Sequence, residues 1–165
     1  MKTDRKRSQL QEKSVAKQFN AKTVVASGSL WFADSDVRSD KFLIECKTTE
    51  KDYYPLSAKV WEKIEREATK DHMRIPIMII DLEDSDRMVV LSPKYFSTKL
   101  DRGYECSQND PNAKSFRISK KYLDECTEDF GEPIIAKLFR ICGEKPHLLF
   151  YMQYKDFIDV FKEEL

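Results

Sequence analysis

Two stretches in the middle of the chain have the clearest hydrophobic patterns. Residues 75–82 (IPIMIIDL) form a nearly continuous apolar run, which is typical of a strand covered on both faces of a sheet. In residues 58–71, Trp61, Ile64 and Ala68 recur at helical spacing while charged residues cover the other face. Ser57 precedes this segment as an N-cap residue. The pattern therefore predicts a helix followed by a buried strand.

The first 48 residues predict a helix and a hairpin. Residues 8–19 carry a narrow apolar stripe and favour a helix, and residues 23–26 are a short β-branched run. Two strands follow, over residues 30–38 and 41–48, and we expect a tight turn at Ser39-Asp40 to join them.

The rest of the chain alternates between short predicted helices and strands. Strands are expected at 88–91 and 148–154, and a polar loop at 101–114. Ser92-Pro93 is a typical helix start. Further helices are predicted over the segments 119–130, 133–142 and 155–165.

Length and charge limit the class of protein. The 165 residues fit one domain, and 29 Lys and Arg balance 29 Asp and Glu. No apolar stretch reaches the roughly 18 residues of a membrane helix, and the charged N-terminus lacks the core of a secretory signal. We therefore expect a cytoplasmic protein.

The zero net charge hides an uneven distribution. Residues 1–47 hold ten Lys and Arg against six Asp and Glu, which gives +4, and the rest of the chain balances this. Arg5, Lys6 and Arg7 cluster at the start, and such a basic arm suits phosphate contacts, although a solvated helix end would have the same composition. The four cysteines form no C-x-x-C pair, so a zinc site is not expected.

The candidate catalytic and metal-binding residues lie on the predicted hairpin. With a two-residue turn at Ser39-Asp40, alternation places Asp34, Asp36, Glu45 and Lys47 on one side of the strand pair, and the apolar residues on the other. Two carboxylates beside a lysine can hold a hard divalent cation such as Mg²⁺ and act on a phosphate ester. A salt-bridged hairpin surface would show the same short pattern, so the pattern alone does not decide.

The ordered set of motifs resembles the PD-(D/E)XK nuclease superfamily, and within it phage and archaeal Holliday-junction resolvases. The resemblance covers about residues 5 to 96. The matching pieces are Glu12, Ser27-Gly28-Ser29, Asp36-Val37, Glu45-Cys46-Lys47-Thr48-Thr49, and Lys63 with Glu67-Ala68 before Pro76. It implies an α/β fold with a restriction-endonuclease-like core of helix, three-strand mixed sheet, helix and strand. The core would span residues 1–100, and residues 101–165 would form a C-terminal α/β extension packed on the same domain.

The resemblance also implies roles for individual residues. Asp36 and Glu45 would be metal ligands, Lys47 the catalytic lysine, and Glu12 a helix carboxylate that completes the metal site. Ser35 stands where the family often has glycine, and Asp34 is a competing carboxylate, so the aspartate ligand is less certain than Glu45. Ser29 would be an active-site serine near the scissile phosphate. The expected DNA contacts are Arg5, Lys6, Arg7, Ser27, Ser29, Thr48, Thr49 and Lys51.

The implied function is a Mg²⁺-dependent endonuclease, with Mn²⁺ able to substitute, that resolves branched DNA in recombination and repair. Paired symmetric cuts need two active sites, so the resemblance implies a homodimer. Two alternatives remain open: the same chemistry on flaps, mismatches or duplex sites, or a non-catalytic DNA-binding protein with this fold. Trp31 and Phe32 could stack on bases, although packing in the core or in a dimer is the simpler interpretation.

Overall fold

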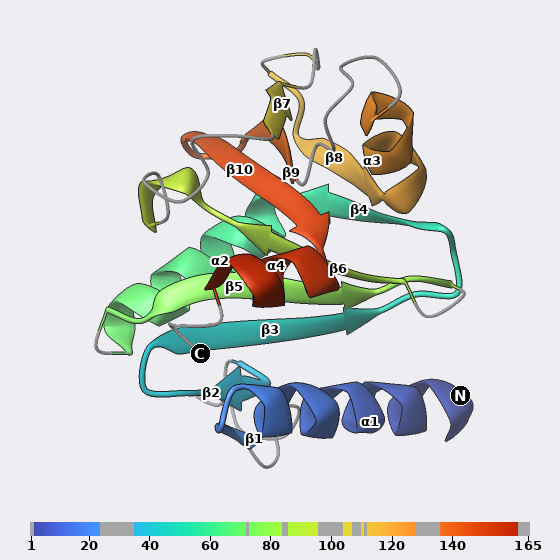
Figure 1. Ribbon diagram of the computed structural model, residues 1–165. Coiled ribbons are helices and arrows are strands. Elements are labelled where there is room, and N and C mark those ends of the chain that lie inside the picture. Colours follow the sequence, from blue (N-terminus) through green and yellow to red (C-terminus); the bar gives the residue numbers. More distant parts are fainter. Residues whose placement is uncertain are drawn as a thin grey trace.

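The structure, a computed structural model, describes residues 2–23, 35–71, 73–83, 86–95, 104–106, 110, 112–127 and 136–161. Its centre is an eight-stranded mixed sheet in the order β1-β2-β3-β5-β6-β10-β9-β7 (Figure 1). The strands are β1 (Lys22–Thr23), β2 (Val37–Arg38), β3 (Phe42–Thr48), β5 (Ile75–Asp81), β6 (Arg87–Leu91), β7 (Tyr104–Cys106), β9 (Ala136–Cys142) and β10 (Pro146–Gln153). β3 and β5 are parallel, as are β7 and β9, and the other pairs are antiparallel.

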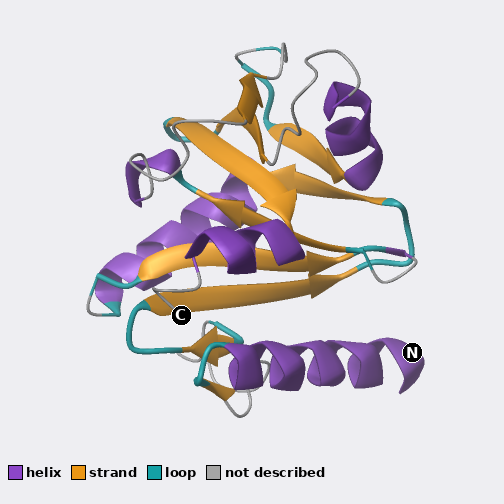
Figure 2. Ribbon diagram, in the orientation of Figure 1, coloured by secondary structure: helices purple, strands orange, loops and turns teal. Residues whose placement is uncertain are grey.

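Helices cover both faces of the sheet, and a separate β-ribbon lies on one of them (Figure 2). The helices are α1 (Lys2–Gln18), α2 (Ala58–Lys70), α3 (Lys120–Thr127), α4 (Tyr154–Phe161) and the short 3₁₀ helix η2 (Pro93–Tyr95). The ribbon pairs β4 (Tyr53–Ser57) with β8 (Ser115–Ser119) in antiparallel register. Among the described residues, no helix is long and apolar enough to cross a membrane.

Each face of the sheet has its own hydrophobic core. α1 and α4 pack on one face, where Ile77 and Ile79 of β5 join the cluster. α2, α3 and the ribbon pack on the other face against Met78 and Ile80. Because side chains alternate along a strand, β5 supplies both cores and is buried throughout its centre. The predicted doubly covered strand is confirmed.

α2 follows its sequence prediction closely. Ser57 is the N-cap, and its Oγ accepts a hydrogen bond from the Val60 amide at 3.4 Å. Trp61, Ile64 and Ala68 are buried against the sheet. The single apolar stripe and the cap residue were sufficient to define this helix because both signals are local.

The hairpin of β2 and β3 turns one residue later than expected. Val37 pairs with Ile44, and the Ser39 amide bonds to the Phe42 carbonyl, so the turn residues are Asp40 and Lys41. The Ser39 hydroxyl also accepts the Phe42 amide at 2.9 Å, which favours this turn over the one at Ser39-Asp40. The pairing moves by two residues in register, so every side chain keeps its predicted face.

Several other predictions were wrong. The segment predicted as a helix over 133–142 is β9 where it is described, because Phe139 and Ile141 alternate with exposed or half-buried residues and face the core. The sequence predicted no element at residues 53–57, which form β4; the missing N–H of Pro55 is tolerated there because the ribbon has only two strands. The expected loop at 101–114 contains β7, and the helix expected to begin at residue 8 begins at Lys2. The expected basic arm is therefore helical.

The sheet continues without a break from the first hundred residues into the last third of the chain. β10 pairs along β6 from Phe150 to Gln153 and also pairs with β9. Residues of the C-terminal segment therefore extend the same sheet and contribute to the two cores described above.

Candidate active site

The candidate site lies at the carboxyl-terminal half of β3, next to the short strand β2. Since Val37 pairs with Ile44, the preceding residue Asp36 comes opposite Glu45. The Asp36 Oδ2 accepts a hydrogen bond from the Cys46 amide at 2.8 Å, so the aspartate is fixed against β3. Glu45 and Lys47 lie opposite Met78 and Ile80 of β5, on the face covered by α2.

Glu45 and Lys47 form a close, largely buried pair. The Lys47 Nζ lies 2.5 Å from the Glu45 Oε1, and the Glu45 residue is 7% exposed. Burial raises the pKa of Glu45, Asp36 adds to the rise, and Lys47 opposes it without cancelling it. The carboxylate therefore sits where its negative charge is not fully compensated.

Lys47 stays protonated at neutral pH. Burial works against its ammonium group, but the charge of Glu45, the hydrogen bond to it and the charge of Asp36 outweigh burial, so the pKa of Lys47 is raised. A permanently charged lysine can orient a water or stabilise developing negative charge, but it cannot take up a proton as a general base.

Glu12 on α1 belongs to the same electrostatic group. Burial raises its pKa, the hydrogen bond from the Ser8 hydroxyl lowers it, and the charges of Asp36 and Lys47 act on it in opposite directions. The Ser8 Oγ lies 3.1 Å from the Glu12 Oε1. The charges of Asp36 and Lys47 thus act on both Glu12 and Glu45, and a group of three carboxylates with a single ammonium favours an added cation.

The donor chemistry fits a hard divalent cation, which prefers carboxylate oxygens and retains several waters. Among the described residues, however, no group of three His, Cys, Asp or Glu side chains is close enough to hold an ion. Asp36 and Glu45, which lie opposite each other, and Glu12 on α1 are the carboxylates of this group whose oxygens have the chemistry that such a cation prefers.

Sequence reasoning missed Gln11, which anchors α1 to the site. Gln11 is 2% exposed, and its Nε2 donates to the Lys47 carbonyl at 3.1 Å and to the Ile79 carbonyl at 3.2 Å. Its place four residues before Val15, on the buried stripe of the helix, was the available signal. The anchored residue directly precedes Glu12 and directly contacts the backbone of Lys47.

The predicted DNA contacts divide into several groups. Arg5, Lys6 and Lys51 are exposed, and Thr48 is half-buried. Arg7 instead donates to the Leu82 carbonyl at 2.9 Å, which holds α1 against the sheet. Thr49 accepts the Lys51 amide at 3.2 Å in the turn after β3, so it has a local structural role. Ser27, Ser29, Trp31, Phe32 and Asp34 lie outside the described residues.

A hollow of about 460 Å³ lies on the other side of Gln11, between α1 and α4. Arg7, Leu10 and Tyr154 are among its lining residues. Two of its charged lining residues are paired with each other, because Arg87 makes a bidentate ion pair with Asp81 at 2.6 and 2.9 Å. Burial raises the pKa of Tyr154 to about 12, so its hydroxyl stays neutral.

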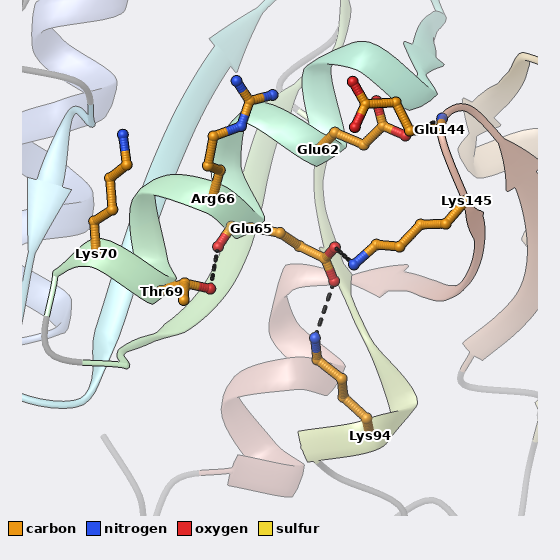
Figure 3. A pocket seen from close by; sticks show the side chains of 8 residues that line it. All are labelled: Glu62, Glu65, Arg66, Thr69, Lys70, Lys94, Glu144 and Lys145. Atoms are coloured by element: carbon orange, nitrogen blue, oxygen red, sulfur yellow. Dashed lines mark hydrogen bonds and ion pairs between the residues drawn. The ribbon is translucent and has the colours of Figure 1, made fainter.

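A second hollow, of about 400 Å³, is lined by charged side chains of α2, η2 and the turn between β9 and β10 (Figure 3). Glu65 bridges Lys94 at 3.0 Å and Lys145 at 3.3 Å. Beside it the ring of the buried His147 lies between Glu62 and Glu65, at 3.2 and 3.3 Å. The ion pairs of Glu65 with the two lysines, together with the contacts of His147, join α2 to the turn, which indicates a structural role.

Comparisons with known proteins give distant similarity to solved structures alone. No family model matches the sequence, and no curated protein matches it. Among solved structures, the fold is similar to that of Hjc, a Holliday junction resolvase from the hyperthermophilic archaeon Archaeoglobus fulgidus, with a TM-score of 0.44 and 17% sequence identity. The similarity covers 67% of this chain and 85% of that chain. A likeness of this degree does not establish a shared function, so the assignment below depends on the geometry of the site.

Proposed function

We propose that this protein is a divalent-metal-dependent DNA endonuclease whose active site consists of Asp36, Glu45, Lys47 and Glu12. One observation carries the proposal: Asp36 lies opposite Glu45, and Glu45 is in direct contact with a protonated Lys47. A plain surface salt bridge has no need of a second, half-buried carboxylate beside it, because the charge of Asp36 raises the pKa of Glu45 and so disfavours its charged form. Clusters of this kind are more typical of functional sites.

Asp36 and Glu45 would hold Mg²⁺, with Mn²⁺ as a substitute, and their other coordination positions would go to water and phosphate oxygens. When bound, the cation supplies charge neutralisation at the phosphate and lowers the pKa of a water. The Asp36 carboxylate is already oriented by the Cys46 amide, so this part of the site is fixed before binding. Glu12 would approach from α1, where Gln11 fixes the helix.

Lys47 would orient the attacking water and stabilise charge on the phosphate in the transition state. Hydrolysis then breaks the bond between phosphorus and the 3′-oxygen, which leaves a 5′-phosphate and a 3′-hydroxyl. Because Lys47 is already protonated, its role is electrostatic throughout.

The substrate we favour is the four-way junction, cut symmetrically by a homodimer. The charge distribution supports a shape-selective enzyme, since a narrow basic region on an otherwise acidic protein binds plain duplex weakly in moderate salt. Two active sites related by a two-fold axis would make paired cuts. The same site chemistry would also serve flaps, mismatches or duplex sites, and these are the competing substrates.

The test incubates the protein and Mg²⁺ with labelled four-way junction, flap and linear duplex. Glu45→Ala and Lys47→Ala are the active-site variants, and Glu50→Ala, which removes an exposed carboxylate from the next loop, is the matched control. Paired symmetric cuts on the junction alone, lost in both variants and kept in the control, support a resolvase. Equal cutting of all substrates favours a general endonuclease. Tight binding without cutting, unchanged in the variants, supports a non-catalytic DNA-binding protein.

A further inference from the structure

The β4–β8 ribbon joins the two halves of the chain next to the candidate site. Pro55 of β4 pairs with Arg117 of β8, so these two residues and Tyr53 lie on the same face of the ribbon. The opposite face carries Leu56 and Ile118, which are buried in the core under α2. The face with Tyr53 and Arg117 is therefore the outer one.

Two cations are held over one aromatic ring on this outer face. The Arg117 guanidinium carbon lies 3.9 Å from the centre of the Tyr53 ring, and the Lys51 Nζ lies 5.4 Å from it. Cation–π contacts of this kind orient a charged group without neutralising it. Both cationic residues are exposed.

The surrounding acidic residues do not neutralise this pair. Glu50 and Asp52 flank Lys51 in the sequence and are exposed. Within the part of the chain that the structure describes, however, Lys51 and Arg117 have no carboxylate partner within ion-pair distance. Two oriented cations without a carboxylate partner among the described residues can both contact phosphate groups of a DNA backbone.

The ribbon is also close to the proposed active site. β4 begins a short loop after β3 ends, and Tyr54 lies on its inner side. The charges of Lys47 and Glu45 both act on the Tyr54 phenol, whose pKa is raised chiefly by burial. Tyr53 is the adjacent residue of β4 and lies on the outer face of the ribbon, so the two cations over its ring lie on the solvent side of the same strand.

We propose that Lys51 and Arg117, oriented over Tyr53, form a phosphate-binding subsite for DNA beside the active site. The inference deepens the proposed function and rests on it. It gives the C-terminal part of the chain a direct role in substrate binding, because Arg117 comes from β8. The sequence predicted Lys51 as a DNA contact from its place after the motif, but it gave no signal for Arg117.

The test measures binding of a fluorescent four-way junction by anisotropy over a range of salt concentrations. All proteins carry Glu45→Gln, which prevents cutting. The double variant Lys51→Ala/Arg117→Ala removes the subsite. The matched control Arg66→Ala/Lys70→Ala removes one arginine and one lysine from exposed positions near the far end of α2. Thermal unfolding verifies that each variant is folded.

We expect the slope of log Kd against log salt to fall by about 1.8 in Lys51→Ala/Arg117→Ala, since each lost contact with duplex phosphates removes about 0.9. The control pair should keep the slope of the parent protein. Tyr53→Phe should bind as the parent does, because it keeps the ring, whereas Tyr53→Leu should bind more weakly.

An unchanged slope in Lys51→Ala/Arg117→Ala would overturn the subsite, and so would an equal loss in the control pair or a complete absence of DNA binding. Cutting by the protein with its native Glu45 is measured separately. If the protein cuts junctions, but Lys51→Ala/Arg117→Ala leaves the slope unchanged, the proposed function is supported and the subsite is not. If the protein never cuts DNA, but the slope of log Kd against log salt falls in Lys51→Ala/Arg117→Ala and not in the control pair, the subsite is supported and the proposed function is not.

Discussion

The carboxylate of Asp36 accepts the backbone N–H of Cys46 at 2.8 Å, one position along β3 from Glu45. A single hydrogen bond thus fixes one acidic group beside another before any cation binds. Such preorganisation is what a metal-binding pair needs, because the repulsion between the carboxylates has already been overcome by folding.

This contact predicts how variants at Asp36 and Asp34 differ. Asp36→Asn keeps an oxygen that can accept the Cys46 amide but loses the charge, so the protein should fold normally and cut DNA about 100-fold more slowly or worse, the size of effect typical of losing one transition-state contact. Asp34→Asn should keep its activity. Initial cleavage rates and thermal unfolding of both variants measure this. Loss of activity in Asp34→Asn alone would make Asp34 the ligand.

Glu45 predicts a link between stability, pH and Mg²⁺. Its folded-state pKa is raised, so the protonated form favours folding. This contribution to stability is present below the unfolded pKa of about 4.3, and it is lost as pH rises through the folded pKa. Glu45→Gln should therefore be at least as stable as the parent protein at neutral pH, with a weaker fall in stability above pH 4.3.

Added Mg²⁺ should reverse this difference. At ten times its Kd, Mg²⁺ should stabilise the parent protein by about 1.4 kcal/mol, which corresponds to a rise in Tm of about 3 to 5 °C. Glu45→Gln should show no such rise, and Glu50→Gln, at an exposed site, should behave as the parent. Scanning calorimetry of the three proteins with and without Mg²⁺ measures the rise in Tm. A rise of equal size in Glu45→Gln would place the cation elsewhere.

Gln11 predicts a stability effect that sequence alone would not suggest. Gln11→Ala removes two hydrogen bonds to the Lys47 and Ile79 carbonyls in a buried position and should cost about 2 to 3 kcal/mol of unfolding free energy. The matched control is Gln9→Ala, which lies on the exposed face of α1 and should change little. Urea unfolding of both variants gives the comparison. Equal stability would mean that α1 is held without Gln11.

Gly143 predicts a steric effect far from the active site. A Cβ atom there would overlap the Glu62 Oε1 and would lie 2.9 Å from the Ala58 Cβ. Gly143→Ala should therefore destabilise the protein by roughly 1 to 3 kcal/mol, the usual cost of overpacking. Adding Glu62→Ala should recover part of the loss, because it removes the closer contact. A double-mutant cycle with no coupling would contradict this geometry.

The sequence predicted the central elements because their signals are local. The apolar run at residues 75–82 and the capped stripe of α2 each define an element without reference to the rest of the chain. The faces of the hairpin were also predicted correctly although its turn was not. Moving the turn by one residue changes the register by two, so Glu45 and Lys47 still point to one face of the sheet while Val37 and Ile44 point to the other.

The failures share a physical cause, which is that the deciding contacts are distant in sequence. β9 is a strand because β10 pairs with its whole length, whereas the local sequence predicted a helix over residues 133–142. Pro55 belongs to a strand because β8, some sixty residues away, pairs with β4. Gln11 bonds to carbonyls of β3 and β5, and no local pattern shows that partnership.

The most direct test of the central claim is single-turnover cleavage of a labelled four-way junction in Mg²⁺, compared with the same reaction in EDTA. The account predicts metal-dependent, symmetric cuts that leave 5′-phosphates and that fall by about 100-fold or more in Glu45→Gln and in Lys47→Ala. The Glu50→Ala control should cut at the rate of the parent protein. Cleavage that persists in EDTA, or that survives in Glu45→Gln, would contradict the assignment of the site.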